Sequence, residues 1–68
     1  MKQILEETNE NEESKGKVNI KRYYYDSKKT DSIVIEQIER FGKEERKISE
    51  MRIPLKNAPD KIRDLVNE

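Results

Sequence analysis

Chemically versatile side chains are concentrated in one short stretch of this 68-residue chain, between positions 15 and 29. The stretch holds six basic side chains and a single acid, Asp26, and it contains three consecutive tyrosines at positions 23–25. Single-stranded nucleic acid is held by cations that follow its phosphates and by aromatic rings on which its bases stack. The pattern therefore predicts a nucleic-acid-binding surface with low sequence specificity.

Enzymatic chemistry has little basis in the composition. The chain contains neither histidine nor cysteine, so the most frequent general base and the strongest nucleophile are both missing. The same absence removes imidazole and thiolate metal ligands and any disulfide. Gly16 and Gly42 are isolated from each other and form no phosphate-binding loop. We expect no enzyme activity, no cofactor or metal, and no small-molecule substrate.

Charge is divided unevenly along the chain, although its total is zero. Residues 1–14 carry one lysine and five glutamates, a net charge of −4, which leaves +4 for residues 15–68. After Leu5 the next apolar side chain is Val18, so the first residues have little to bury. We predict a disordered acidic tail over residues 1–16 and a folded module over residues 17–68. As an alternative, the tail glutamates could compete with phosphate for the basic surface.

β-branched and aromatic residues predict extended segments over residues 18–25, 32–41 and 47–55. Gly42 predicts the turn of a hairpin, and Pro54 predicts that the last strand ends there or lies at an edge. Apolar residues between positions 34 and 48 also fall near helical spacing, which leaves a helix over residues 31–51 as the alternative.

An amphipathic helix is predicted over residues 57–68. Asn57 is suited to the N-cap and Pro59 to the first turn. One apolar stripe runs along this helix, formed by Ala58, Ile62, Leu65 and Val66. A helix this short needs a packing partner, so we expect Ile62, Leu65 and Val66 to contact the sheet or to form a dimer seam.

Together these elements predict an α+β fold class, with a three-stranded antiparallel sheet followed by one C-terminal amphipathic helix. A chain of 68 residues without disulfides or metals buries a modest core. Oligomerisation is the remaining supplement, and the two-fold homodimer is its most common form, so we expect a homodimer. No apolar run is long enough to span a membrane and no signal-peptide core is present, so we expect a cytoplasmic protein without a membrane partner.

The residues predicted to bind nucleic acid are basic or aromatic and lie in or beside the expected strands: Lys17, Lys21, Tyr23, Tyr25, Lys28, Lys29, Arg40, Arg46 and Arg52. On an extended chain Lys21, Tyr23 and Tyr25 point the same way, as a stacking platform with adjacent charge. A purely structural alternative packs Tyr24 against the helix beside Val18 and Ile20, and assigns the lysines to solubility and edge protection.

Three stretches carry a resemblance to known families: Lys21-Arg-Tyr-Tyr-Tyr-Asp-Ser-Lys-Lys29, Ser32-Ile-Val-Ile-Glu-Gln-Ile-Glu-Arg40, and Met51-Arg-Ile-Pro-Leu55 before the helix. Over residues 17–68 the pattern resembles the PUR repeat family and the coactivator family of positive cofactor four. The resemblance implies a dimer, a curved sheet face that binds single-stranded DNA or RNA, and a role in transcription regulation. It also implies contacts from Lys21, Tyr23, Tyr25, Lys28, Lys29 and Arg40. The fourth strand of a full PUR repeat has no counterpart among the expected elements.

Two functional hypotheses result. The first is a homodimeric module that binds single-stranded DNA or RNA. The second is a protein-interaction or regulatory accessory module, for instance of a virus or mobile element, that uses the acidic tail or a sheet edge. A third possibility, a β-ribbon dimer on double-stranded DNA, applies if residues 31–51 are helical.

Overall fold

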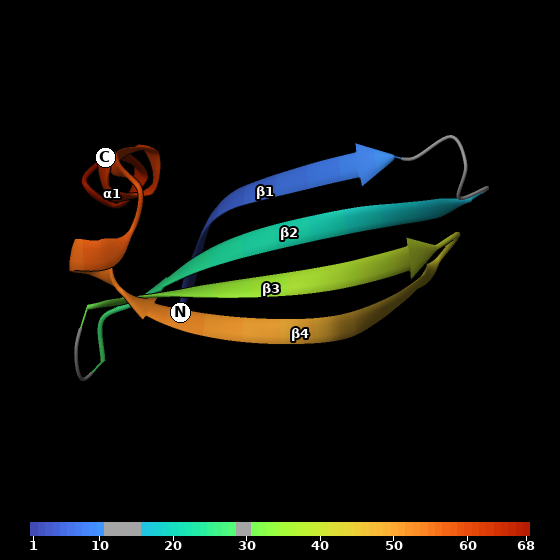
Figure 1. Cartoon of the computed structure of the whole chain (residues 1–68), viewed down its shortest axis with the longest axis horizontal. Helices are drawn as coiled ribbons and strands as arrows, with labels where there is room; N and C mark the ends of the chain where they lie inside the picture. The colour runs from blue at the N-terminus through green and yellow to red at the C-terminus, as the bar shows by residue number, and fades with distance from the viewer. Residues whose placement is uncertain (11–15, 29–30) are drawn as a thin grey trace.

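The computed structural model describes residues 1–10, 16–28 and 31–68, and its described part is an antiparallel sheet followed by a helix. The elements are β1 (Lys2–Glu10), β2 (Lys17–Asp26), β3 (Ser32–Phe41), β4 (Glu44–Pro54), a 3₁₀ turn (Leu55–Asn57) and α1 (Asp60–Val66). Neighbours in sequence are neighbours in the sheet, which has the order β1-β2-β3-β4 (Figure 1). The predicted α+β class is confirmed, with four strands instead of three.

β1 is the strand that the sequence analysis did not predict. It runs antiparallel to β2, with Glu6 opposite Arg22. Ile4 and Leu5 pack against the main apolar cluster, so the few apolar side chains of this segment are used. Pairing with β2 gives β1 its backbone hydrogen bonds along one side, which explains how an acidic stretch joins the sheet. The rest of the expected tail, residues 11–15, lies outside the described residues.

β3 and β4 form the predicted hairpin, and the helical alternative over residues 31–51 is wrong. Phe41 pairs with Glu44 across a two-residue turn. Gly42 occupies the first turn position with a φ of 61°, the left-handed region that favours glycine at this place in a hairpin. The isoleucine-rich run of β3 has stiff side chains that fit a pleated surface better than a helix.

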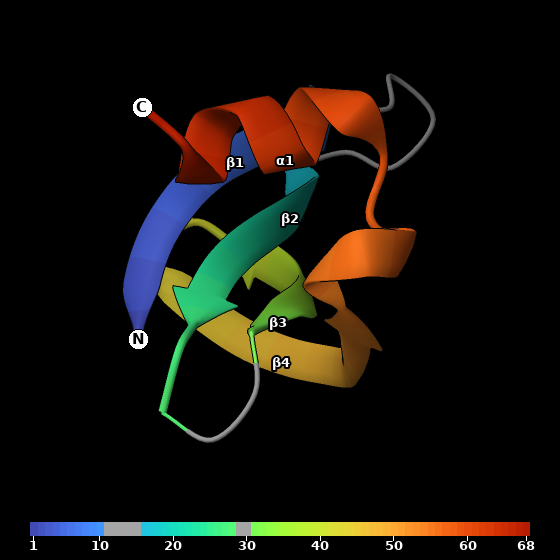
Figure 2. The same ribbon diagram turned by 90° about the vertical axis from the view of Figure 1, so that its left-hand side faces the viewer.

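α1 covers one end of one sheet face, which we call the helix side (Figure 2). Ile33 is fully buried there, together with Ala58 and Ile62 from the chain that leads into and forms α1. Leu65 and Val66 pack against the same cluster, so the predicted apolar stripe is confirmed. The helix itself is shorter than expected.

The start of α1 differs from the prediction. Asn57 closes the 3₁₀ turn, and Pro59 holds the N-cap position without a side-chain capping bond. Asp60 follows in the first turn, where its carboxylate suits the positive end of the helix dipole. No helix within the described residues is long and apolar enough to cross a membrane.

The opposite sheet face has a smaller apolar centre. Ile20 lies opposite Ile38 across β2 and β3, and both are buried together with Val34. The sheet is strongly twisted, as Figure 2 shows along the strands. Apolar side chains therefore occupy both faces, but α1 covers only part of one.

Candidate functional site

The two tyrosines of the expected platform share one face of the sheet, as predicted, and both are partly buried there. Tyr23 and Tyr25 lie on the helix side and pack against the cluster of Ile33 and Ile62. Their neighbours across β3 are apolar isoleucines, and that apolar face is the one on which α1 packs. Part of each ring is therefore covered by the cluster, while binding of nucleic acid by these residues stays a prediction.

Both of these tyrosines also use their hydroxyl groups. Tyr23 donates a 2.8 Å hydrogen bond to Oε1 of Glu7, and Tyr25 donates one of 2.8 Å to Oδ1 of Asp31. Burial and then the hydrogen bond to Glu7 raise the pKa of Tyr23 to about 12. The alternative in which Tyr24 packs against the helix is wrong, because Tyr24 lies opposite Val34 on the other face.

Three of the predicted cationic contacts are engaged in ion pairs. Lys17 lies 2.6 Å and Arg46 3.2 Å from the carboxylate of Glu39. Arg52 lies 3.0 Å from Oδ2 of Asp26. The hydrogen bond from Lys17 is the main reason that the pKa of Glu39 is lowered. These positive charges are neutralised within the sheet.

The remaining predicted cations are not gathered into one surface. No ion pair is found for Lys21, Lys28 or Arg40 within the described parts of the chain. Lys21 lies on the helix side, Arg40 on the opposite face, and Lys28 beyond the end of β2. Lys29 lies outside the described residues.

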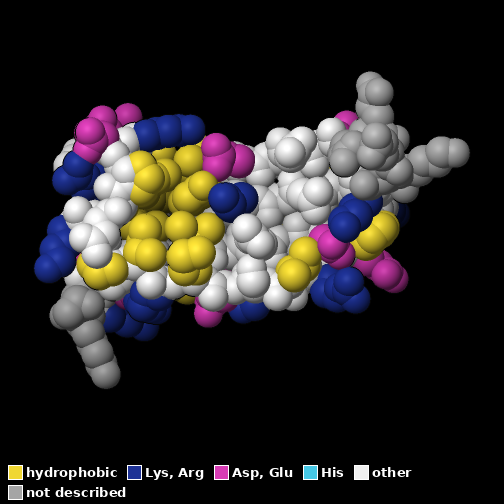
Figure 3. Space-filling view, in the orientation of Figure 1, with side chains coloured by type: hydrophobic (Ala, Val, Ile, Leu, Met, Phe, Trp, Pro, Cys, Tyr) yellow, Lys and Arg dark blue, Asp and Glu magenta, His cyan; other side chains and the backbone are white. Residues whose placement is uncertain are grey.

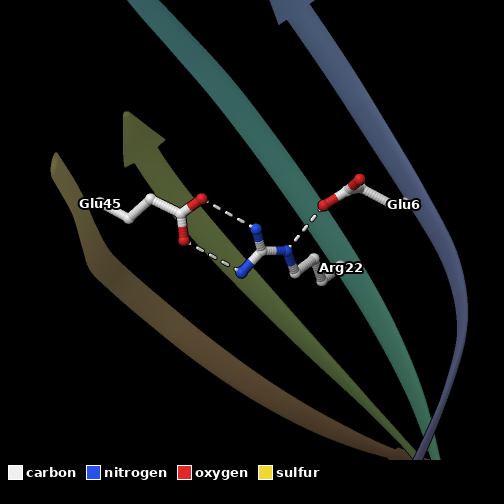
Figure 4. Close-up of polar contacts among 3 residues, drawn as sticks. All are labelled: Glu6, Arg22 and Glu45. Carbon is white, nitrogen blue, oxygen red and sulfur yellow. Dashed lines mark hydrogen bonds and ion pairs between the residues drawn. The ribbon is translucent and has the colours of Figure 1, made fainter. Parts of the chain in front are cut away.

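Arg22 connects both edges of the sheet across the face opposite α1 (Figure 4). Its Nε lies 2.7 Å from Glu6 on β1, and its two terminal nitrogens lie 3.2 and 3.0 Å from the carboxylate of Glu45 on β4. Hydrogen bonds from the guanidinium to Glu6 and then Glu45 raise the pKa of Arg22. This basic residue is a structural cross-link, with three of its five N–H donors and its charge engaged by two carboxylates.

An apolar groove remains open on the helix side, between α1 and β4. Its volume is about 320 Å³, and its apolar lining comes from Leu5, Tyr23, Ile33, Ile35, Ile53, Pro59 and Ile62. Figure 3 shows apolar side chains gathered over the half of the molecule on the left, whereas the other half is mostly white, with charged and a few apolar side chains. Glu7, Lys21 and Lys61 also line this groove. The groove is amphipathic, with its apolar floor reaching the edge strand β4.

The edge strand β4 is the most exposed element. Within it only Ile53 is partly buried. Met51, next to Ile35 on the helix side, is 57% exposed, and Ile48 is 52% exposed. β1, the other edge, has no comparably exposed large apolar side chain within its strand. An open edge presents unpaired backbone groups to a partner strand, so β4 and the groove together are the candidate site.

Only part of β4 is regular enough to pair. Ser49 pairs with Gln37 and Lys47 with Ile38, so Ile48 is an extra residue that forms a bulge. Pro54 ends the strand and has no backbone N–H to donate. The regular open edge therefore comprises residues 49–53. The alternation of Ser49, Met51 and Ile53 in the sequence was the signal for this surface.

Comparison of the chain with protein-family models, curated proteins and solved structures finds no match. Two surfaces of the molecule are therefore the candidates for function: the dispersed, partly neutralised cations, and the open apolar edge.

Proposed function

We propose that this chain is a non-enzymatic protein-interaction module that binds an extended protein segment by strand addition along β4. The half-exposed Met51 on an open edge strand, beside the apolar groove, is the observation that carries the proposal. In strand addition, backbone hydrogen bonds supply affinity and alternate side chains supply specificity. Residues 49–53 provide the backbone, and the groove provides the side-chain contacts.

The geometry explains why the edge and the groove act together. Side chains of successive residues alternate between the faces of a sheet. A strand added beside β4 would place every second side chain on the helix side, next to Met51 and Ile53. Apolar residues at those positions would extend the floor of the groove and remove Met51 from water, at about 25 cal/mol per Å² of apolar surface.

A pair of variants tests this proposal. Met51→Lys places a charge in the open apolar edge, whereas Phe41→Lys makes the same change at a side chain of similar exposure, 50%, outside that edge. A protein partner recovered with the wild-type chain and with Phe41→Lys should be lost with Met51→Lys. Equal recovery with both variants would contradict strand addition at β4.

Binding of single-stranded nucleic acid is the second candidate, on the strength of a different observation. Phe41 is half exposed at the end of β3, and neither Arg40 nor Lys43 beside it has an ion pair within the described residues. An exposed ring whose neighbours in sequence are cations without ion pairs suits a stacked base. The number of strands before the helix, four, equals that of a full PUR repeat, with β1 preceding the segment that resembles the first strand of the repeat.

Oligonucleotide titrations separate the two candidates. Fluorescence anisotropy with single-stranded and duplex oligonucleotides at two salt concentrations should show binding that weakens steeply with salt if phosphates are contacted. Phe41→Ala should then weaken binding, and Met51→Ala should leave it unchanged. Absence of binding at low ionic strength would remove the nucleic-acid candidate and leave the β4 proposal intact.

A further inference from the structure

We infer that the segment that binds to β4 is β4 of a second copy of this chain, in an antiparallel register with Met51 opposite the Met51 of the other copy. This inference rests on the proposed use of the β4 edge and names its partner. It also identifies the contact surface of the homodimer that we expected because the core of the chain is small. Two copies would form one continuous eight-stranded sheet.

Symmetry limits the possible registers. A two-fold axis between two antiparallel edge strands runs normal to the sheet and maps each face onto itself. Two residues that lie opposite each other must then have side chains on the same face of the sheet. Their sequence numbers therefore differ by an even number, and the two-fold axis passes beside a single residue midway between them. The regular part of β4 lies between the bulge at Ile48 and Pro54, and its midpoint is Met51.

Charge selects the same register. With Met51 at the centre, Glu50 faces Arg52 of the other copy, and this contact occurs twice because of the symmetry. Centring on Glu50 or on Arg52 would instead place two like charges directly opposite each other, which is destabilising. Centring on Ser49 would place Arg46 opposite Arg52. Within residues 49–53, the register centred on Met51 joins opposite charges.

The arrangement also covers the open apolar surface. On the helix side, Met51 of each copy would contact the other, and each Ile53 would lie opposite the Ser49 of the other copy. The two apolar grooves would meet across the new strand pair. Met51, which is 57% exposed in the single chain, would become part of a shared core.

Charge reversal tests the register. In sedimentation velocity of the full chain over a range of concentrations, the wild type should form a reversible dimer. Glu50→Arg and Arg52→Glu should each weaken it by about tenfold, since each creates two like-charge contacts. The double variant E50R/R52E should restore dimerisation, because the charges face each other again. Met51→Lys should give a monomer.

Two controls separate a lost interface from a lost fold. Arg52 and Glu50 have partners within the chain, at 3.0 Å to Asp26 and 3.4 Å to Lys47, so thermal unfolding of each variant must be measured as well. Arg46→Glu reverses an exposed arginine of β4 beyond the bulge and should leave the dimer intact.

The outcomes distinguish this inference from the proposed function. A wild-type monomer at every concentration, or a double variant that does not recover, would overturn the self-pairing of β4. If Met51→Lys nevertheless loses a protein partner that Phe41→Lys keeps, strand addition stands and its partner is another protein. A dimer unaffected by Met51→Lys would show that the copies meet elsewhere and would also overturn the inference.

Discussion

The hydroxyl of Tyr23 donates a 2.8 Å hydrogen bond to Oε1 of Glu7, which joins the aromatic segment to the acidic N-terminal segment. Two other contacts connect the acidic segment to β2 and to α1. Nε of Arg22 lies 2.7 Å from Oε1 of Glu6, and Nζ of Lys61 lies 3.5 Å from Oε2 of Glu7. The acidic segment therefore contacts β2 through Tyr23 and Arg22 and contacts α1 through Lys61.

The Tyr23–Glu7 contact predicts a loss of stability at alkaline pH. Burial first, and then Glu7, raise the pKa of Tyr23 to about 12, above the value of about 10 expected in the unfolded chain. The contribution of this group is complete below pH 10 and is lost as the pH rises through 12. Tyr23→Phe has no ionisable group at this position. Its free energy of unfolding, measured by urea titration from pH 9 to 12, should therefore fall less steeply than that of the wild type.

Parallel pH profiles for the wild type and Tyr23→Phe would contradict this account. Tyr25→Phe is the matched comparison, because that hydroxyl bonds to Asp31 instead of to the acidic segment. Glu7→Gln should lower the stability of the wild type at neutral pH while leaving that of Tyr23→Phe less affected, as expected for residues in contact.

β1 supplies a second prediction, on the stability of the whole module. A chain that begins at residue 11 loses the strand and the packing of Ile4 and Leu5 against the cluster. Its free energy of unfolding should fall by about 2 kcal/mol or more, given the apolar surface that these side chains bury. Leu5→Ala should lower the free energy of unfolding by part of this amount. Glu10→Ala, at an exposed residue at the end of β1, should change the free energy of unfolding little. Unchanged unfolding of the shortened chain would mean that the segment contributes nothing to the fold.

The difficulty of predicting β1 from the sequence has a physical cause. β2, β3 and β4 contain β-branched residues in period two, and this pattern gave their positions and the hairpin. β1 has only Ile4 and Leu5 as buried apolar side chains, and the rest of its contacts are backbone pairs and long-range ion pairs. Such contacts depend on residues eight or more positions away, and a local pattern does not contain them.

The candidate site, like the fold, was predicted from the sequence only in part. The alternation of side chains along a strand correctly predicted that Tyr23 and Tyr25 lie on one face of β2 and Tyr24 on the other. It did not say which set α1 would cover, because that depends on the neighbours in β3, Ile33 and Ile35. The ion pairs that neutralise Lys17, Arg46 and Arg52 likewise arise from strand register, which the sequence leaves open.

A third prediction concerns the core. Ile33 is fully buried between the sheet and α1, so Ile33→Ala leaves a cavity that its surroundings fill only partly. Its cost should be about 2–4 kcal/mol, a large share of the stability of a module of this size. Ile48→Ala, at a 52% exposed isoleucine, should cost less than about 0.5 kcal/mol. Chemical denaturation of both variants checks the difference, and equal losses would contradict the placement of the core.

A fourth prediction concerns the cross-link made by Arg22. Its planar guanidinium binds Glu45 with two nitrogens and Glu6 with a third, a geometry that a lysine ammonium does not reproduce. Arg22→Lys keeps the positive charge, yet it should lower the free energy of unfolding by about 0.5–1 kcal/mol, since the groups are partly exposed to water. Arg46→Lys changes a single contact at a 77% exposed side chain and should have no measurable effect.

Salt separates the cross-link of Arg22 from simple packing. Salt ions screen the charges of exposed carboxylates, and the Debye length falls to about 3 Å at 1 M salt. The difference in free energy of unfolding between the wild type and Arg22→Lys should therefore shrink as the salt concentration rises from about 0.05 M to 1 M. A difference that stays constant with salt would assign the role of Arg22 to the packing of its aliphatic stem on the sheet. Because Glu6 and Glu45 lie on the two edge strands, loss of this residue should also increase amide hydrogen exchange in β1 and β4 more than in β3.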